Sequence, residues 1–191
     1  KWSSNPDFSF FAKPLTELQG KVLGLVGFGR IAQKVAEIGH AFGMNVIFYN
    51  HRPKKVKQDW QKQVSLDTLL KNSDVVSLHV PQTPDTTEMI NDSSLKKMKD
   101  SAILLNTARG GLINEKDVAD ALNNGQIAAA AVDVAQCEPL NADSPLLDAD
   151  NCYITPHIAW APQETRARLL GIAVDNLTEF LAVRKKNVVE K

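Results

Sequence analysis

Three residues of this 191-residue sequence have side chains that could do chemistry together. Arg109 stands in the stretch NTARGG, Glu138 precedes a proline in CEPL, and His157 follows a proline in TPHIAWAP. A guanidinium can bind a carboxylate through two parallel hydrogen bonds, and an imidazole can donate or accept a proton near neutral pH. A carboxylate beside the imidazole favours its charged form. Taken singly, each residue also fits a structural role, as a surface ion pair, a loop carboxylate or a buried histidine.

The three candidates follow successive predicted strands. Open α/β sheets bind ligands beyond the carboxyl ends of their strands, so side chains that follow neighbouring parallel strands meet at one edge. We therefore expect the guanidinium, the carboxylate and the imidazole to share a site, and this grouping favours catalysis over three separate structural roles. The predicted strands are 102–106 before Arg109, 127–134 before Glu138, and 152–156 before His157.

The elements that must position these residues alternate between strand and helix. Short apolar runs such as VLGLVGFG are typical of strands that are buried on both faces of a parallel sheet. The alternation predicts an α/β fold with a Rossmann-type, doubly wound parallel sheet covered on both faces by helices. The remaining predicted strands are 22–29, 45–50 and 75–80, and the predicted helices are 65–73, 86–99, 115–125, one after the first strand and one that begins at Pro162.

Capping residues and apolar stripes add detail to these helices. Ser65 and Asn114 are good N-cap residues, so each predicts a helix start. Apolar residues at helical spacing predict an apolar face on the first helix and on the last. The stripes are Ile31, Val35, Ile38 and Phe42 in the first helix, and Leu170, Val174, Leu177 and Leu181 in the last.

The stretch GFGRIA indicates a dinucleotide-binding loop. It lies between a predicted buried strand and a predicted helix, which is the context that this glycine pattern requires. Gly27 permits the tight turn, and Gly29 lets a pyrophosphate approach the backbone at a helix N-terminus. Arg30 and Ile31 would then offer backbone N–H groups to the phosphates. The alternative is a glycine turn without a ligand, which the context disfavours.

The residues after the second predicted strand bear on the choice of cofactor. An NAD site usually has an acidic residue there to bind the ribose hydroxyls, whereas this chain has Asn50. Asparagine does not repel a 2′-phosphate, and Arg52, Lys54 and Lys55 could bind one. A solvated basic loop is the alternative. NAD(H) and NADP(H) therefore both remain open, with a slight preference for NADP(H).

The composition excludes several other classes of protein. Lysine plus arginine equals aspartate plus glutamate, 22 of each, so no excess charge points to nucleic acid or to an anionic membrane. No apolar run approaches the roughly 20 residues that a membrane span needs. Cys137 and Cys152 lack the spacing of a metal site, so none is predicted. Two free thiols favour a reducing compartment, and hence a cytoplasmic location.

The chain resembles the coenzyme-binding domain of the D-isomer-specific 2-hydroxyacid dehydrogenases. The matching motifs GFGRIA, HVPQTPDTTEMIN, NTARGG, AVDVAQCEPL and TPHIAW occur in the family's order over nearly the whole chain. The resemblance implies an NAD(P)-dependent oxidoreductase that transfers a hydride between the cofactor and a 2-keto acid or D-2-hydroxy acid. HIAW and the entry segment WSSNPDFSFF are most similar to glycerate dehydrogenases (hydroxypyruvate reductases), which implies hydroxypyruvate/D-glycerate, or glyoxylate, as substrate.

The resemblance also implies a role for each candidate residue. Arg109 binds the substrate carboxylate, His157 is the general acid and base, and Glu138 pairs with His157. Asp133 meets the nicotinamide. The cofactor site predicted from the glycine loop and the resemblance comprises Gly27, Gly29, Arg30, Ile31, Asn50, His51, Arg52, Val80, Pro81, Thr86, Thr107, Ala108, Asp133 and Ala159.

The same resemblance predicts the domain organisation. Residues 1–19 would be an entry linker from a separate substrate domain, and residues 20–161 the dinucleotide-binding domain. Residues 162–191 would be a long helix and tail that return to the substrate domain. We therefore expect an isolated coenzyme-binding domain of a two-domain enzyme, inactive alone, and a homodimer in the complete protein.

The sequence leaves two other functions on this fold open and argues against three other classes of enzyme. An NAD-sensing corepressor on the same fold can keep the same three residues, and a D-lactate or phosphoglycerate dehydrogenase also fits. A short-chain dehydrogenase needs Tyr-x-x-x-Lys, but four residues after Tyr49 and Tyr153 stand Pro53 and His157. Formate dehydrogenases carry glutamine in place of Glu138. A methyltransferase would leave the three candidate residues unexplained.

Overall fold

The computed structural model describes residues 2–11, 15–56 and 58–189, and a single parallel sheet organises them. Its seven strands lie in the order β3-β2-β1-β4-β5-β6-β7. The order runs outward from β1 in both directions, which is the doubly wound arrangement predicted from the sequence. The strands are β1 Val22–Val26, β2 Asn45–Tyr49, β3 Lys62–Gln63, β4 Val75–Leu78, β5 Ile103–Asn106, β6 Ala129–Val132 and β7 Cys152–Ile154.

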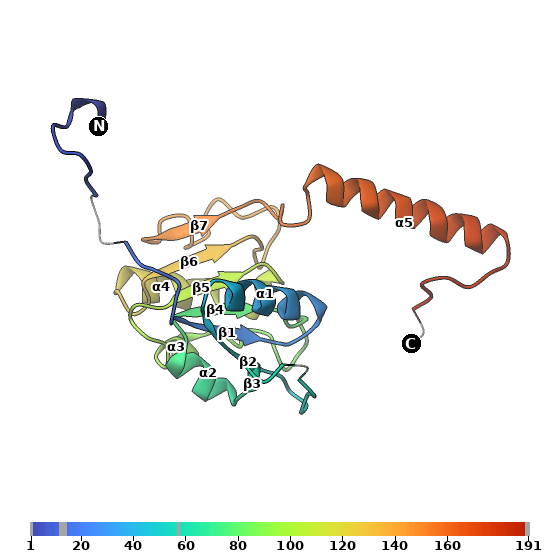
Figure 1. The fold of residues 1–191 in the computed structure, drawn as a ribbon, viewed down its shortest axis with the longest axis horizontal. Helices are drawn as coiled ribbons and strands as arrows, with labels where there is room; N and C mark the ends of the chain where they lie inside the picture. The colour runs from blue at the N-terminus through green and yellow to red at the C-terminus, as the bar shows by residue number, and fades with distance from the viewer. Residues whose placement is uncertain (1, 12–14, 57, 190–191) are drawn as a thin grey trace.

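Helices cover both faces of the sheet, and each face has its own core. α1 packs with Leu25, Phe28 and Phe48 on one face, while α2, α3 and α4 close a larger core on the other. α5 extends away from the sheet (Figure 1). The helices are α1 Arg30–Ala41, α2 Leu66–Asn72, α3 Asp92–Leu95, α4 Glu115–Asn123 and α5 Gln163–Leu181, with 3-10 turns η1 Trp2–Ser4 and η2 Gly110–Leu112.

Both predicted N-caps are confirmed. The Ser65 side chain accepts a hydrogen bond from the backbone N–H of Thr68 at the start of α2. The Asn114 side chain accepts one from the N–H of Asp117 at the start of α4. Each cap satisfies a donor that has no partner within its own helix, so local sequence alone set where these helices begin.

The helix predicted over residues 86–99 is wrong in extent, because only α3 forms within it. Residues 88–90 instead run beside the segment 111–113, where the N–H groups of Glu88 and Ile90 donate to the carbonyls of Gly111 and Leu112. A reciprocal pair of hydrogen bonds between Asn91 and Ser94 then starts α3. Backbone bonds to a distant segment thus replace the helix that local propensity favoured. The short edge strand β3 was missed.

The apolar stripe predicted on the first helix faces solvent. Ile31, Ile38 and Phe42 are 73%, 60% and 61% exposed, and only Val35 is partly buried against the core. The face of α1 that meets the sheet consists of the small residues Ala32, Ala36 and Gly39. A Cβ at Gly39 would lie 2.6 Å from a methyl carbon of Leu23, so close contact with β1 requires small residues. Small side chains therefore define the packing face.

The stripe on the last helix is also exposed. Leu170, Val174, Leu177 and Leu181 are each more than half exposed, and α5 buries no residue against the described part of the chain. Within residues 2–11, 15–56 and 58–189, no helix has both the length and the apolar character to cross a membrane. The helix predicted from this periodicity is confirmed, but its apolar stripe does not pack against this core.

Gly24 tests the packing of β1 against α2. A Cβ at this position would lie 2.1 Å from the Ser73 hydroxyl oxygen and 2.8 Å from a methyl carbon of Leu69. We expect Gly24→Ala to lower the free energy of unfolding by about 1–3 kcal/mol, because overpacking displaces α2. Urea denaturation measures this change.

Gly171→Ala is the matched control, since nothing lies within 4 Å of its added carbon. It should not lower the free energy of unfolding and should raise it by up to about 1 kcal/mol, because alanine is favoured over glycine inside an exposed helix such as α5. Equal urea midpoints for Gly24→Ala and the unsubstituted protein would contradict this account of the packing.

Candidate active site

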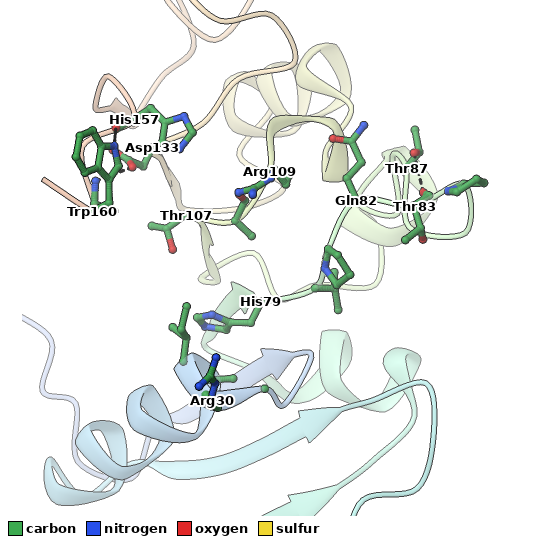
Figure 2. Close-up of a pocket in the computed structure, with 18 residues that line it drawn as sticks. Arg30, His79, Gln82, Thr83, Thr87, Thr107, Arg109, Asp133, His157 and Trp160 are labelled. Atoms are coloured by element: carbon green, nitrogen blue, oxygen red, sulfur yellow. Dashed lines mark hydrogen bonds between the residues drawn. The ribbon is translucent and has the colours of Figure 1, made fainter. Parts of the chain in front are cut away.

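A pocket with a volume of about 1220 Å³ lies beyond the carboxyl ends of the central strands. It is lined from β1, β4, β5, β6 and β7 by the segments that follow each strand (Figure 2). Arg109 and His157 come from different loops and lie on the same side of it, with Arg30 across from them. The parallel order of the sheet thus brings together the groups that the sequence suggested.

Most of the predicted cofactor residues line this pocket. From the first half of the chain these are Gly29, Arg30, Ile31, Val80 and Pro81. From the second half they are Thr107, Ala108, Asp133 and Ala159. Gly27 directly follows β1, two residues before the first residue that lines the pocket. There its φ of 91° and the 2.7 Å from its would-be Cβ to the His79 carbonyl oxygen require glycine.

The glycine loop fits a dinucleotide phosphate. Gly29 is the N-cap of α1, and nothing lies within 4 Å of the position where a Cβ would stand. No side chain caps the helix and no acidic residue occupies its first turn. The free N–H groups and the positive end of the helix dipole are therefore available to an anion in the pocket.

The basic loop after β2 lies outside the pocket lining. Asn50 donates from its side-chain amide to the carbonyl of Arg52, and His51 and Arg52 are exposed. Lys54 folds back over the Phe28 ring and donates to the Phe28 carbonyl beside the glycine loop. The loop thus flanks the nucleotide end of the site, and contact with a cofactor remains a prediction for Asn50, His51 and Arg52.

Asp133 is a buried carboxylate, 4% exposed, that holds the segment around His157. Its Oδ1 accepts hydrogen bonds from the Thr155 hydroxyl at 2.5 Å and the Ile158 N–H at 2.9 Å, and its Oδ2 accepts the Ala159 N–H at 2.8 Å. Burial by itself raises the pKa of Asp133, but these donors outweigh it and lower the pKa below its usual value. The carboxylate is therefore ionised at neutral pH.

His157 and Glu138 form the pair that the sequence predicted. Nδ1 of His157 lies 2.7 Å from Oε2 of Glu138, and both side chains are partly exposed. The hydrogen bond from His157, together with that from the Ala135 N–H, lowers the pKa of Glu138. A carboxylate at Nδ1 leaves Nε2 as the ring nitrogen free to serve a substrate.

Hydrogen bonds also fix the backbone around His157. Its φ is 53°, in the left-handed region that only some non-glycine residues adopt. The His157 carbonyl accepts a hydrogen bond from the Trp160 indole at 2.8 Å. Together with the hydrogen bonds that the Ile158 and Ala159 N–H groups donate to Asp133, this contact fixes the turn that presents the imidazole.

Arg109 is presented by a short turn after β5. The buried side chain of Asn106 accepts the Ala108 N–H at 3.1 Å and donates to the Arg109 carbonyl at 2.9 Å. The guanidinium is exposed and donates to the adjacent Ala108 carbonyl. Its charge contributes to the lowered pKa of Glu138, so the cation and the acid–base pair share one neighbourhood.

Sequence reasoning missed part of the pocket wall. His79 lines the pocket and shares a hydrogen bond with Ser77, and burial lowers its pKa, so it is neutral near pH 7. Gln82, Thr83 and Thr87 also line the pocket, whereas the predicted Thr86 instead donates to the Pro81 carbonyl within its loop. The usable signal was the motif HVPQTPDTT, which contains all of them. Across residues 2–11, 15–56 and 58–189, no cluster of possible metal ligands is found.

Comparison with known proteins identifies related sequences over almost the full chain. Residues 2–159 match the family described as D-isomer specific 2-hydroxyacid dehydrogenase, NAD binding domain. The chain is 50% identical over 192 residues to a hydroxypyruvate reductase of Blautia hydrogenotrophica, covering 100% of this chain and 60% of that protein. It is 42% identical over 191 residues to a glycerate dehydrogenase of Methylorubrum extorquens, covering 99% and 59%. The chain thus spans about 60% of the length of these relatives.

Two similar solved structures contain nicotinamide cofactors. An acyclic imino acid reductase (Bsp5) in complex with NADPH and D-Arg has a TM-score of 0.82 and 35% identity, covering 92% of this chain and 55% of that one. A D-isomer specific 2-hydroxyacid dehydrogenase from Lactobacillus delbrueckii ssp. bulgaricus, in its NAD complexed form, has a TM-score of 0.84 and 30% identity, covering 97% and 60%. Together with the family match, they support a nicotinamide cofactor but do not distinguish NAD from NADP.

The pairing of His157 with Glu138 can be tested by titration. We expect His157→Gln to raise the pKa of Glu138 toward its ordinary value, since the charged hydrogen-bond donor is lost. Because the folded-state pKa of Glu138 is lowered, the stabilisation from its ionised carboxylate is fully present above the ordinary carboxyl pKa and is lost as the pH falls through the lowered value. A ¹³C NMR titration of labelled glutamate carboxyls measures the change.

Asp67 provides an internal control for a parallel titration of labelled aspartate, because the bond from Lys97 lowers its pKa far from this site. Its titration should be the same in both proteins. An unaltered Glu138 titration in the variant would show that the imidazole does not set the pKa of this carboxylate.

Proposed function

This chain belongs to the D-isomer-specific 2-hydroxyacid dehydrogenase family, and we propose that it is the coenzyme-binding domain of an oxidoreductase acting on a 2-keto acid/D-2-hydroxy acid pair. The observation that carries the proposal is the His157–Glu138 pair, at 2.7 Å, beside Arg109 on the pocket that contains the glycine loop. A bound nicotinamide would supply or accept the hydride at C2 of the substrate.

His157 would move the proton that accompanies the hydride. In reduction, negative charge grows on the C2 oxygen, and a protonated imidazole donates a proton to it from Nε2. In oxidation, the same nitrogen removes the hydroxyl proton. Glu138 accepts a hydrogen bond from Nδ1, which fixes the orientation of the ring and keeps Nε2 for the substrate.

Arg109 would bind the substrate carboxylate. Its exposed guanidinium offers two parallel donors, which suit a planar carboxylate better than a single ammonium does. Binding at this group orients the neighbouring carbonyl toward the cofactor and toward His157, and such orientation converts an encounter into an efficient reaction. Asp133 would support the nicotinamide end by holding the turn that ends at Ala159.

The substrate that the observations support best is hydroxypyruvate/D-glycerate, with glyoxylate as a smaller alternative. Relatives of 50% and 42% identity carry the names hydroxypyruvate reductase and glycerate dehydrogenase, and another, from Aeropyrum pernix, is named glyoxylate reductase with 45% identity. We propose that a separate substrate domain, to which residues 162–191 return, completes the pocket. A cytoplasmic homodimer is part of the same proposal.

For the cofactor we propose a preference for NADP(H). The position after β2 is Asn50 rather than an acidic residue, and the loop carries exposed Arg52 and Lys55. Both residues follow β2, which pairs with β1, so their loop lies beside the glycine loop, where they could meet a 2′-phosphate. Lys54 is already engaged by the Phe28 carbonyl, so it is a less suitable ligand.

Kinetics of the full-length enzyme test the catalytic assignment. We expect His157→Gln to lower kcat for reduction of hydroxypyruvate about 100-fold or more, because proton donation is lost. Arg109→Lys should raise KM for the keto acid about tenfold with a smaller effect on kcat, since lysine lacks the paired donors. Steady-state rates at saturating cofactor measure both parameters.

Lys96→Arg, at the exposed C-cap of α3 and outside the pocket lining, is the control for an exchange of arginine and lysine and should change neither constant. Near-normal turnover by His157→Gln would refute the acid–base role, and an unchanged KM in Arg109→Lys would refute the carboxylate contact.

Cofactor preference has its own test. We expect kcat/KM to be higher with NADPH than with NADH, and Arg52→Gln to raise KM for NADPH about tenfold while leaving KM for NADH unchanged, because only NADPH has the 2′-phosphate. Lys62→Gln on β3 is the control. A kcat/KM that favours NADH by about tenfold, or ~1.4 kcal/mol, would contradict the preference.

A further inference from the structure

The loop that carries Glu138 is attached to a buried carboxylate that the proposed mechanism does not use. Glu115 is the first residue of α4 and is 8% exposed. Its Oε1 accepts the Gln136 N–H at 2.7 Å, and its Oε2 accepts the Ser144 hydroxyl at 2.8 Å. Asn114 caps the helix, so the Glu115 carboxylate serves the loop and not its own helix.

Hydrogen bonds on either side of the Ala135–Gln136 peptide link Glu115 to the imidazole. Glu115 holds the backbone of Gln136, and the preceding N–H, that of Ala135, donates to Oε1 of Glu138 at 3.1 Å. Oε2 of Glu138 then lies 2.7 Å from Nδ1 of His157. Each oxygen of Glu138 thus has its own donor, and one of these donors belongs to the stretch that Glu115 fixes.

The same stretch of loop supports the turn that presents Arg109. A Cβ on Gly110 would lie 1.9 Å from the carbonyl carbon and oxygen of Ala135, so the two backbones are in direct contact. The Gln136 side chain also donates to the Ile113 carbonyl at 2.9 Å. A shift of residues 135–136 would therefore disturb Arg109 and Glu138 together.

The chemistry of the Glu115 site favours a strong attachment. A carboxylate at the first position of a helix is stabilised by the positive end of the helix dipole. Hydrogen bonds to an ionised acceptor are stronger than neutral ones, and a buried site shields them from water. Removal of the carboxylate would leave the Gln136 N–H without its acceptor in a partly buried position, which favours movement of the loop.

Resting on the proposed function, we propose that Glu115 is a positioning residue that holds residues 135–136 so that Glu138 reaches His157 and the Arg109 turn keeps its place. Asp133, which directly follows β6, holds the His157 segment. The two members of the acid–base pair are thus attached to the scaffold by separate buried carboxylates.

The test compares Glu115→Ala, Glu115→Gln and Ser144→Ala in the full-length enzyme. Glu115→Ala removes the acceptor for the Gln136 N–H, Glu115→Gln keeps an oxygen there, and Ser144→Ala removes only the second contact. We expect Glu115→Ala to raise the pKa of Glu138 toward its ordinary value in a ¹³C NMR titration. The same variant should lower kcat about 10- to 100-fold, the cost of misplacing a catalytic group, with cofactor Kd changed less than about twofold. Glu115→Gln and Ser144→Ala should resemble the unsubstituted enzyme in all three measurements.

A folded Glu115→Ala variant with the original Glu138 titration would overturn the proposal. If this variant does not fold, Glu115→Asp decides, because a side chain shorter by one methylene draws the acceptor away from the Gln136 N–H: a raised Glu138 pKa supports the proposal, and an unaltered one overturns it. The titration does not depend on turnover. An enzyme without activity on any 2-keto acid would therefore count against the proposed function, while the titration would still decide the role of Glu115.

Discussion

Parallel strand pairing is the constraint on which the site depends. Because all neighbouring strands of the sheet run in the same direction, their carboxyl ends lie along one edge. The backbone ladder places Asn106, Val132 and Ile154 near that edge in adjacent strands, and Arg109, Asp133 and His157 follow within a few residues. These groups are 24 residues or more apart in the sequence, and the pairing of the strands brings them together.

The sheet brings these loops close together, but further hydrogen bonds are needed to fix the orientation of their side chains. Asp133 and Glu115 are both buried carboxylates. Asp133 accepts hydrogen bonds from two backbone N–H groups of the segment that bears His157, and Glu115 accepts one from the segment that bears Glu138. Buried charges are costly unless their acceptor capacity is filled, so each of these carboxylates is stable only with its loop in place. The cost of burial thereby couples the fold to the arrangement of His157 and Glu138.

At the glycine loop, small residues set the geometry of the site. Gly27 adopts a left-handed backbone against His79, and Gly29 leaves open space at the start of α1. Ala32, Ala36 and Gly39 let α1 lie close to the sheet, which directs its N-terminus into the pocket. The larger apolar residues of α1 consequently point outward, opposite to the expectation from size alone. The exposed apolar stripe on α1 is thus a consequence of where the close contacts occur.

Local chemistry explains which features could be predicted. The glycine loop, the N-caps Ser65 and Asn114 and the strand runs act over a few residues, so the sequence by itself determined the fold class and the groups that can do chemistry. The pairing of residues 88–90 with 111–113, the exposure of the predicted stripes and the wall formed by His79 depend on contacts between distant segments. Only the tertiary structure decided these, together with the attachment of Glu138 through Glu115, because a hydrogen bond between residues 115 and 136 has no signature in the spacing of either residue.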